Sequence, residues 1–477
     1  MTKEFIVAIE LGSSKITGIA GKKNPDGSIS ILAVVKEDST SCIRKGVVFN
    51  IDKTVVCLTN IIKKLEANLK TNILRVYVGV GGQSIRSINN VIVKELPTET
   101  VVTQEMIDSL MDSNRSMSYV DQEILDAATQ EYKVDSIYQL DPVGIPCTRL
   151  EGNFLNILWR KSFYKNLNQC LNKAGVEIAE LYLAPLSLAD AVLTENEKRA
   201  GCVLVDLGAD TTTVLVYYKN ILRHLVVIPL GGENITKDIT SLLMDEKQAE
   251  AMKLKYASAY TENDKIDDAK KYPIDAERSV ESRKFIEIVE ARLQEIIENV
   301  FYQIPNEYTD KLIGGIILTG GASNMRNIEK AFALKAPTSK IRVAKFVNLN
   351  INSKISEITA HNATMNTILG LLAKGDINCA GEEFTPDDLF KSSEPKHTST
   401  QTKEPRTFNE TAGKGIVQTE EEKERLRKQK EYQEVAERKA KEEEQRSLEQ
   451  KKRDNSPVHK FWKNLKNFAR KITEEED

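Results

Sequence analysis

Glu10-Leu11-Gly12-Ser13-Ser14-Lys15 is a short phrase that the chain repeats 196 residues later as Asp206-Leu207-Gly208-Ala209-Asp210-Thr211. Each copy follows an apolar run and precedes a β-rich run, which predicts two strands joined by a tight turn with a carboxylate and a glycine. Two such hairpins can face each other across a cleft, with backbone N–H groups directed at phosphates and carboxylates near a cation. Because the two copies have equivalent settings, they indicate a duplicated nucleotide-binding core.

The length and composition of the chain indicate a multidomain globular protein. Its 477 residues suffice for two or more domains, and a net charge of −3 argues against bulk nucleic-acid binding. The six cysteines show no C-x-x-C spacing, which predicts buried, reduced thiols in a cytosolic protein, and the four scattered histidines give no metal constellation. No apolar run approaches the ~18 residues that a membrane span needs, and we expect no signal peptide.

Strand-like and helix-like segments alternate over residues 1–375, which is typical of an α/β protein. Within this body, one stretch has a different pattern and predicts an insert, and another is largely helical and charged. The boundaries that we expect are 1–84, 161–200 and 355–375 for a first half, 201–234 and 306–354 for a second half, 85–160 for an inserted α+β subdomain, and 235–305 for a helical subdomain.

Beyond residue 375 the composition changes to that of a linker, over residues 376–455. Residues 376–419 are rich in Thr, Ser, Pro, Lys and Glu, so we expect disorder with a coil span of ~35 Å. Residues 420–453 contain 11 acids and 12 bases, which predicts a solvated charged helix of ~50 Å. A coiled coil is the alternative, but it would need a sustained a/d stripe.

The segment after the linker predicts an amphipathic helix over residues 456–473, with Ser456 as its cap and Pro457 in its first turn. One face carries Val458, Phe461, Trp462, Leu465, Phe468, Ala469 and Ile472, and the flanking faces carry Lys460, Lys463, Lys466, Arg470 and Lys471. This pattern favours binding to a membrane surface, since each buried large apolar side chain contributes ~1.5–3 kcal/mol and each cation near anionic lipid ~1 kcal/mol. The alternative is that the apolar face docks on the protein's own body.

The glycine turns of the body supply candidate nucleotide contacts. Their backbone and hydroxyl groups can donate to phosphate, and the paired carboxylates of Glu10 and Asp206 can hold Mg²⁺ through water and act as the catalytic groups. Lys15 can balance phosphate charge, or it is an ordinary exposed turn lysine. The candidates are Gly12, Ser13, Ser14 and Lys15 in the first loop, Gly208, Ala209, Asp210, Thr211 and Thr212 in the second, Gly231 and Gly232 for ribose and phosphate, and Gly320, Gly321, Ala322 and Met325 around adenine.

This ordered set resembles the actin, sugar-kinase and heat-shock-chaperone superfamily, in which two ribonuclease-H-like halves hold ATP and Mg²⁺ between them. Within it, the chain resembles the FtsA family of actin-like bacterial cell-division proteins. The insert at 85–160 resembles that family's subdomain 1C, and the terminal basic helix resembles its membrane-targeting sequence. The stretches that carry the resemblance are Ala8–Ile16, Val78–Ile85, Asp141–Gly144, Asp206–Gly208, Ala249–Lys253, Ile288–Arg292 and Leu318–Ala322.

The resemblance implies further site residues and partners. Glu250 and Lys253 would approach the ribose and adenine, and Arg292 and Glu295 would line the far side of the pocket, although all four also suit an ordinary charged helix face. The family polymerises on the inner face of the cytoplasmic membrane at the division site. It binds the C-terminal tail of the tubulin-like FtsZ through subdomain 2B, here the helical subdomain, and recruits later division proteins through subdomain 1C.

Glu10 departs from the superfamily, which mostly has Asp at this position. One added methylene moves the carboxylate by roughly one bond length, enough to displace a metal-bound water from in-line attack. The resemblance therefore implies ATP binding with weak or absent hydrolysis. Two other interpretations stay open: a phosphotransferase of the sugar-kinase type, which would need a base and a second pocket, and a pilus-type cytoplasmic actin-like adaptor, which the basic terminal helix disfavours.

Overall fold

The computed structural model describes residues 4–336 and 340–383, all within the first of the two units into which the chain divides, Met1–Ile416. The amphipathic helix expected at 456–473, the charged helix expected at 420–453 and most of the expected linker lie outside the described residues. In the described part of the chain, no helix is both long and apolar enough to cross a membrane.

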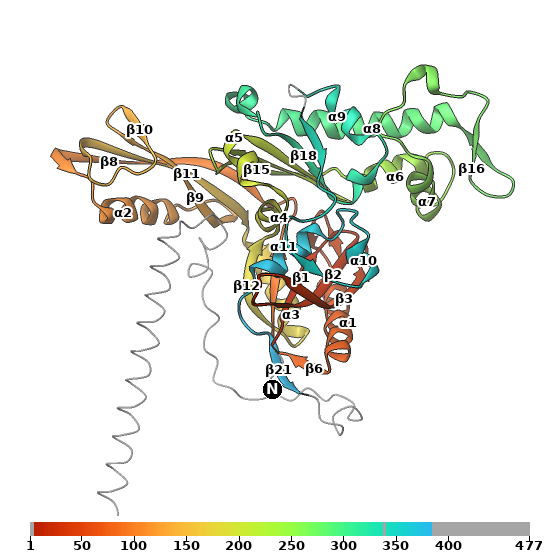
Figure 1. Cartoon of the computed structure of the whole chain (residues 1–477), viewed down its shortest axis with the longest axis horizontal. Coiled ribbons are helices and arrows are strands. Elements are labelled where there is room, and N and C mark those ends of the chain that lie inside the picture. Colours follow the sequence, from red (N-terminus) through yellow and green to blue (C-terminus); the bar gives the residue numbers. More distant parts are fainter. Residues whose placement is uncertain (1–3, 337–339, 384–477) are drawn as a thin grey trace, which may run out of the picture. The chain divides into compact units, whose positions relative to one another are not determined.

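The first half is a six-stranded mixed sheet (Figure 1). Its strands lie in the order β12 (Glu177–Leu183), β7 (Arg75–Val80), β1 (Ile6–Leu11), β2 (Lys15–Lys23), β3 (Ile29–Asp38) and β20 (Ile351–Asn352). The first three strands in the chain form an antiparallel meander, and β7 and β12 extend the sheet in parallel with β1. The packed helices are α1 (Ile51–Leu69), α3 (Lys161–Lys173), α4 (Ala184–Val192), α10 (Ser356–Thr359) and α11 (Asn366–Lys374).

The second half repeats this arrangement. Its strands are β19 (Ile341–Val343), β18 (Gly315–Thr319), β13 (Cys202–Leu207), β14 (Thr212–Tyr218) and β15 (Ile221–Ile228), with α5 (Glu195–Ala200) and α9 (Ile328–Ala333) beside them. Read in that order, the five strands have the same directions as β12-β7-β1-β2-β3. The registers also agree, because Glu10 is opposite Thr17 and Asp206 is opposite Thr213. The repeated phrase therefore belongs to a duplicated fold, as the sequence predicts.

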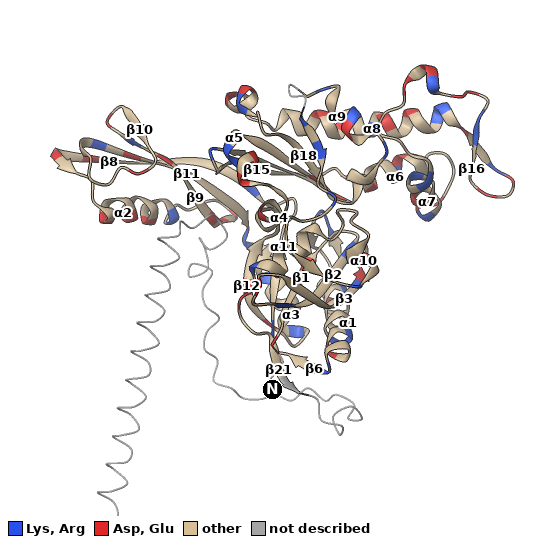
Figure 2. Ribbon diagram, in the orientation of Figure 1, with Lys and Arg blue, Asp and Glu red and all other residues tan. Residues whose placement is uncertain are grey.

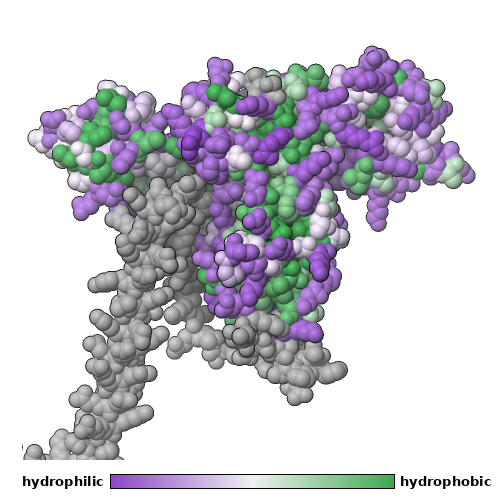
Figure 3. Space-filling model, in the orientation of Figure 1, coloured by the Kyte–Doolittle hydropathy of each residue, from purple (hydrophilic) through white to green (hydrophobic). Residues whose placement is uncertain are grey.

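The inserted subdomain is an antiparallel sheet covered by one helix. It contains β8 (Arg86–Val101), β9 (Gln122–Val134), β10 (Ile137–Gln139), β11 (Pro146–Arg160) and α2 (Gln104–Arg115). Asp135 separates β9 from β10 with a left-handed backbone (φ 50°), and its carboxylate accepts from the N–H groups of Thr148 and Arg149. Exposed hydrophobic side chains gather on this subdomain (Figure 3).

The inserted subdomain is joined to the second sheet as well as to the first half. Arg86 at the start of β8 pairs with Val226 of β15, so the two sheets are continuous. The hydroxyl of Ser87 accepts from the N–H of Leu225 (2.8 Å) and donates to its carbonyl (3.0 Å). The pattern of residues 85–160 indicates a separate insert but gives no sign of this seam, because it depends on a strand far along the chain.

The helical subdomain contains α6 (Gly232–Thr240), α7 (Glu246–Tyr256) and α8 (Ser282–Tyr302), with a short hairpin of β16 (Lys271–Pro273) and β17 (Ser279–Glu281). Acidic and basic side chains lie along α7 and α8 (Figure 2). The hairpin packs on the helices through Tyr272, whose ring stacks on Tyr256 at 4.5 Å and meets Phe285 edge-on at 5.5 Å.

Residues 376–383, which the composition assigns to the linker, are bonded to the first half. The N–H groups of Asp376 and Ile377 donate to the Tyr77 hydroxyl (3.0 and 2.8 Å), and that of Cys379 donates to Phe5 (2.8 Å). A short strand, β21 (Ala380–Glu383), then pairs with β6 (Thr71–Ile73). These bonds use the backbone groups of residues 376–383, so a polar composition does not reveal them. Cys379 is one of six free cysteines, of which only Cys57 is not buried.

Candidate functional site: the cleft between the two halves

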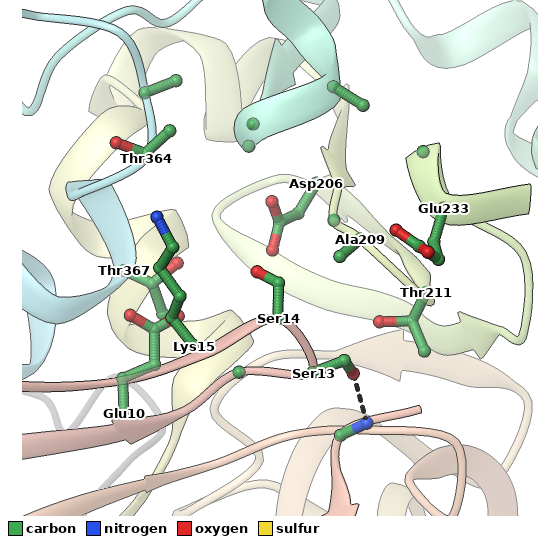
Figure 4. Close-up of a pocket in the computed structure, with 18 of the residues that line it drawn as sticks. Glu10, Ser13, Ser14, Lys15, Asp206, Ala209, Thr211, Glu233, Thr364 and Thr367 are labelled. Carbon is green, nitrogen blue, oxygen red and sulfur yellow. Dashed lines mark hydrogen bonds between the residues drawn. The ribbon is translucent and has the colours of Figure 1, made fainter. Parts of the chain in front are cut away.

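A cleft of about 680 Å³ lies where the two halves meet and is lined by both copies of the repeated phrase. Figure 4 shows Glu10, Ser13, Ser14 and Lys15 from the first half facing Asp206 and Thr211 from the second. The carboxylates occupy the ends of β1 and β13, and each of these is the middle strand of the five that the two halves share. The duplication therefore brings two equivalent turns together around one space.

The first loop holds its backbone carbonyls away from the cleft. Gly12 accepts a hydrogen bond from the Ser39 hydroxyl (2.7 Å), and Ser14 accepts from the Ser39 N–H (3.1 Å). Because a trans peptide directs its C=O and N–H in opposite directions, the N–H groups of Ser13 and Lys15 point away from these partners. The loop thus offers donors rather than acceptors, which suits an anion.

The second loop is also fixed through its backbone carbonyls. The carbonyl of Gly208 accepts from Gly232 (3.0 Å), and that of Ala209 accepts from Glu233 (2.8 Å). Glycine is required in both loops because a Cβ would lie 2.6 Å from the Lys15 carbonyl oxygen at Gly12, and 2.8 Å from the Thr211 carbonyl oxygen at Gly208. The two turns are therefore equivalent in their close contacts as well as in sequence.

Gly320 closes the cleft against the second carboxylate. It follows β18 with a positive φ of 86°, and a Cβ there would lie 2.4 Å from Asp206 Oδ1 and 2.6 Å from the Leu207 carbonyl oxygen. The strand before it pairs in parallel with β13, with Thr319 beside Asp206. The glycine turn that the sequence singles out is thus the turn that packs on Asp206.

The surroundings of the two carboxylates disfavour their negatively charged forms. Burial, with the neighbouring charge of Asp206, raises the pKa of Glu10 to about 8, and Lys36 and a hydrogen bond from Thr367 oppose that rise. Burial raises the pKa of Asp206 to about 6. A cation between them would relieve both effects, so the donor set suits a hard, oxygen-binding metal ion.

Helix α7 contributes a charged pair to the cleft. Lys253 Nζ lies 2.6 Å from Glu250 Oε2 and donates to the Gly232 carbonyl (2.9 Å) and the Thr236 hydroxyl (2.8 Å). The Thr236 hydroxyl in turn donates to Glu250. Both charged side chains line the cleft. Their mutual bonds fix them against α6, so they form one preorganised polar wall.

Most of the residues that the sequence nominates line this cleft. They are Glu10, Gly12, Ser13, Ser14, Lys15, Asp206, Gly208, Ala209, Thr211, Gly232, Glu250, Lys253, Gly320, Gly321, Ala322 and Met325. Thr212 does not: its hydroxyl donates to the Leu230 carbonyl (2.9 Å), and the next residue, Thr213, lines the cleft instead. Gly231 also lies outside the lining, because its missing side chain lets it pack on Ala209. Asp210 lies outside it as well and binds Lys45.

The expectation that Arg292 and Glu295 line the far side of the pocket is wrong. Arg292 Nε bonds Asp238 Oδ2 of α6 at 2.6 Å, and its guanidinium also bonds Glu295. Neither residue lines the cleft. The pair joins α8 to α6, so the charged-helix alternative is the correct one for these two residues.

The structure adds residues to the cleft that sequence reasoning missed. Lys36 comes from β3 and Glu233 from α6, while Ala184 and Pro185 come from the start of α4. The remaining missed residues include Asn362, Ala363, Thr364 and Thr367, which precede or begin α11. Among these missed residues, only Thr17 and Thr213 could have been found from the sequence, because they occupy equivalent positions after the carboxylates of the two copies of the phrase. The others reach the cleft through tertiary packing.

Comparisons with known proteins agree with this architecture. A family model described as cell division protein FtsA matches residues 203–367, and one for the SHS2 domain inserted in FtsA matches residues 82–158. Cell division protein FtsA of Porphyromonas gingivalis is 33% identical over 384 residues, 78% of each chain. That of Neisseria meningitidis is 32% identical and covers 70% of this chain and 84% of its own.

A solved structure of a PilM-PilN type IV pilus biogenesis complex matches with a TM-score of 0.53 at 15% identity. The match covers 77% of this chain and 97% of the other, and at this identity it shows the fold alone. The expected fold, two ribonuclease-H-like halves around a cleft with an α+β insert, is confirmed. The chain belongs to the FtsA family and is an actin-like cell-division protein.

Proposed function

We propose that this protein binds ATP with Mg²⁺ in the cleft, polymerises on the inner face of the cytoplasmic membrane, and tethers the FtsZ ring there through its C-terminal amphipathic helix. The observation that carries the proposal is the pair of equivalent loops, each with a carboxylate and a glycine that the close packing requires, on opposite walls of one cleft. In this function, the duplicated cleft acts as a nucleotide-controlled joint between the two halves.

The cleft suits a nucleotide in size and chemistry. Its volume of about 680 Å³ falls within the ~300–1,000 Å³ of small-molecule pockets. The two loops would bind phosphates, the Glu250–Lys253 pair would bind the ribose and adenine edge, and Gly321 would lie against the base. Glu10 and Asp206 would hold Mg²⁺ through water, and the ion would supply charge neutralisation for the phosphates.

Hydrolysis is proposed to be weak or absent. Glu10 extends one methylene further into the cleft than Asp would, and its pKa is raised to about 8. The longer side chain displaces the carboxylate from the position that would orient a metal-bound water for in-line attack. Nucleotide binding would then control the protein by changing how the two halves are arranged, and not by rapid ATP hydrolysis.

The membrane and partner assignments rest on sequence and family. Residues 456–473 combine an apolar face with five flanking cations, which is the pattern of a helix that lies on an anionic lipid surface. Membership of the FtsA family favours binding of the FtsZ C-terminal tail by the helical subdomain and of later division proteins by the inserted subdomain. Matches to FtsA models favour this proposal over a sugar-kinase-type phosphotransferase or a pilus-type adaptor.

Liposome flotation of three forms of the protein tests the tether. The full chain should float with anionic vesicles, and a form ending at Asn455 should stay at the bottom. A form ending at Thr473 lacks only the acidic tail and keeps the helix, so it should float and serves as the matched control. Equal flotation of the full chain and the form ending at Asn455 would refute the tether.

A further inference from the structure

A short hairpin beside the cleft contacts both phosphate loops. Strands β4 (Ile43–Arg44) and β5 (Val47–Val48) are joined by Lys45 and Gly46, which both adopt positive φ angles of 48° and 74°. Positive φ angles at both central residues are typical of a two-residue type I′ hairpin turn. The side chain of Lys45 is exposed, and the contacts that matter here are made by its backbone.

The two N–H groups of this turn bond to different halves of the protein. Gly46 donates to the Ser13 hydroxyl of the first loop at 2.9 Å (Figure 4). Lys45 donates to Asp210 Oδ2 of the second loop at 3.1 Å. One turn therefore joins the first loop of one half to the second loop of the other, at the end of the cleft where the loops face each other.

The same turn is also bonded to the root of the inserted subdomain. The carbonyl of Lys45 accepts from the N–H of Gln83 at 2.9 Å. Gly46 and Gly82 pack so closely that a Cβ on Gly46 would lie 2.5 Å from the Gly82 Cα. Gln83 lies three residues before the start of β8. A continuous path of bonds thus runs from Asp210 through the Lys45 backbone to Gln83.

We infer that the Lys45–Gly46 turn is a clasp that holds the two phosphate loops closed around a bound nucleotide and couples their closure to the root of the inserted subdomain. The inference rests on the proposed nucleotide site and deepens it. Asp210 is then a positioning residue: it lies outside the cleft lining, and its carboxylate fixes the second loop to the clasp. Release of nucleotide requires the loops to separate, so it requires the Asp210–Lys45 bond to break.

Stopped-flow release of a fluorescent ATP analogue from the full chain, with Mg²⁺, tests the clasp. Asp210→Ala should release the analogue about three- to tenfold faster, the effect of losing one hydrogen bond. Asp210→Asn keeps an oxygen acceptor and should restore most of the slow release. Since both variants lose the same charge, their difference isolates the bond. Asp264→Ala, an exposed aspartate on a 3₁₀ turn of the helical subdomain, is the control for an unrelated charge loss.

A second pair of variants tests the clasp from the other half. Gly46→Ala should accelerate release, because its Cβ would displace Gly82. Gly27→Ala is matched in backbone conformation, with φ 80°, but its Cβ would meet no atom within 4 Å, so release should stay at the wild-type rate. Hydrogen exchange at the Gln83 amide should also accelerate in Asp210→Ala relative to Asp210→Asn.

The outcomes separate the clasp from the nucleotide site. Wild-type release rates in both Asp210→Ala and Gly46→Ala, with the analogue still bound tightly, would overturn the clasp and leave the site intact. Equal acceleration in Asp210→Ala and Asp210→Asn would also overturn it, because charge and not the bond would be the cause. Failure of the wild-type chain to bind the analogue would overturn the nucleotide site and the clasp with it.

Discussion

Substitution of Gly320 by alanine should damage the cleft in a way that can be calculated from its neighbours. Gly320 has φ 86° and ψ 169°, a region that is almost restricted to glycine and costs other residues ~1–3 kcal/mol. The new Cβ would lie 2.4 Å from Asp206 Oδ1. A comfortable contact is roughly 3.5 Å, so the carboxylate or the turn must move by about 1 Å.

The expected result is a loss of both stability and nucleotide affinity. We predict that Gly320→Ala lowers the free energy of unfolding by ~1–3 kcal/mol and weakens Mg-ATP binding at least about tenfold, equivalent to ~1.4 kcal/mol. Urea unfolding and isothermal titration with a non-hydrolysable ATP analogue measure the two effects separately. The displacement of Asp206 accounts for the affinity loss, and the backbone conformation accounts for the stability loss.

Gly144→Ala supplies the matched control for this experiment. Gly144 has φ 89°, and a Cβ there would meet no atom within 4 Å. It should lose ~1–2 kcal/mol of stability through its backbone alone and bind nucleotide as the wild type does. A folded Gly320→Ala protein with wild-type affinity would refute the assignment of this turn and of Asp206 to the nucleotide site.

Three further predictions concern charge, catalysis and the start of the linker. Because the folded-state pKa of Glu10 is raised to about 8, the folded protein binds more protons than the unfolded chain between about 4.5 and 8, so its stability should fall as pH rises through this window. Thermal unfolding across that range should show this slope, and it should flatten in Glu10→Gln. Glu10→Asp restores the shorter carboxylate and should raise phosphate release in a coupled assay without changing ATP affinity; an unchanged rate would remove Glu10 as the cause of weak hydrolysis. Tyr77→Phe removes the acceptor of two backbone N–H groups and should cost ~1–3 kcal/mol in urea unfolding, with faster proteolysis at residues 376–381; unchanged proteolysis would show that β21 alone holds this segment.

Sequence reasoning succeeded where the structure depends on local pattern. The strand–turn–strand units at Glu10 and Asp206 were predictable because alternating apolar runs and a turn glycine lie within a few residues. The α+β insert was predictable because its pattern differs from that of its surroundings. The α/β class followed from the alternation of strand-like and helix-like segments, and the two halves followed from the resemblance that the repeated phrase helps to carry.

The sequence did not predict which of several similar side chains reach the cleft, because tertiary contacts determine this. Thr212 and Thr213 are neighbours in a strand, and only the register of β14 determines which one faces the cleft. Arg292 and Asp210 are charged residues in plausible positions, but their partners, Asp238 and the Lys45 amide, come from distant segments. Similarly, residues 376–381 are ordered because their backbone N–H groups donate to the Tyr77 hydroxyl and the Phe5 carbonyl, which composition does not encode.

Electron microscopy on a lipid monolayer tests the central claim most directly, because it examines nucleotide control, tethering and assembly together. The full chain with Mg-ATP should form filaments on anionic lipid. It should form none without nucleotide, and neither Asp206→Ala nor the form ending at Asn455 should form filaments on the monolayer with Mg-ATP. Filaments of equal density with and without ATP, or from Asp206→Ala, would contradict nucleotide control through the duplicated cleft.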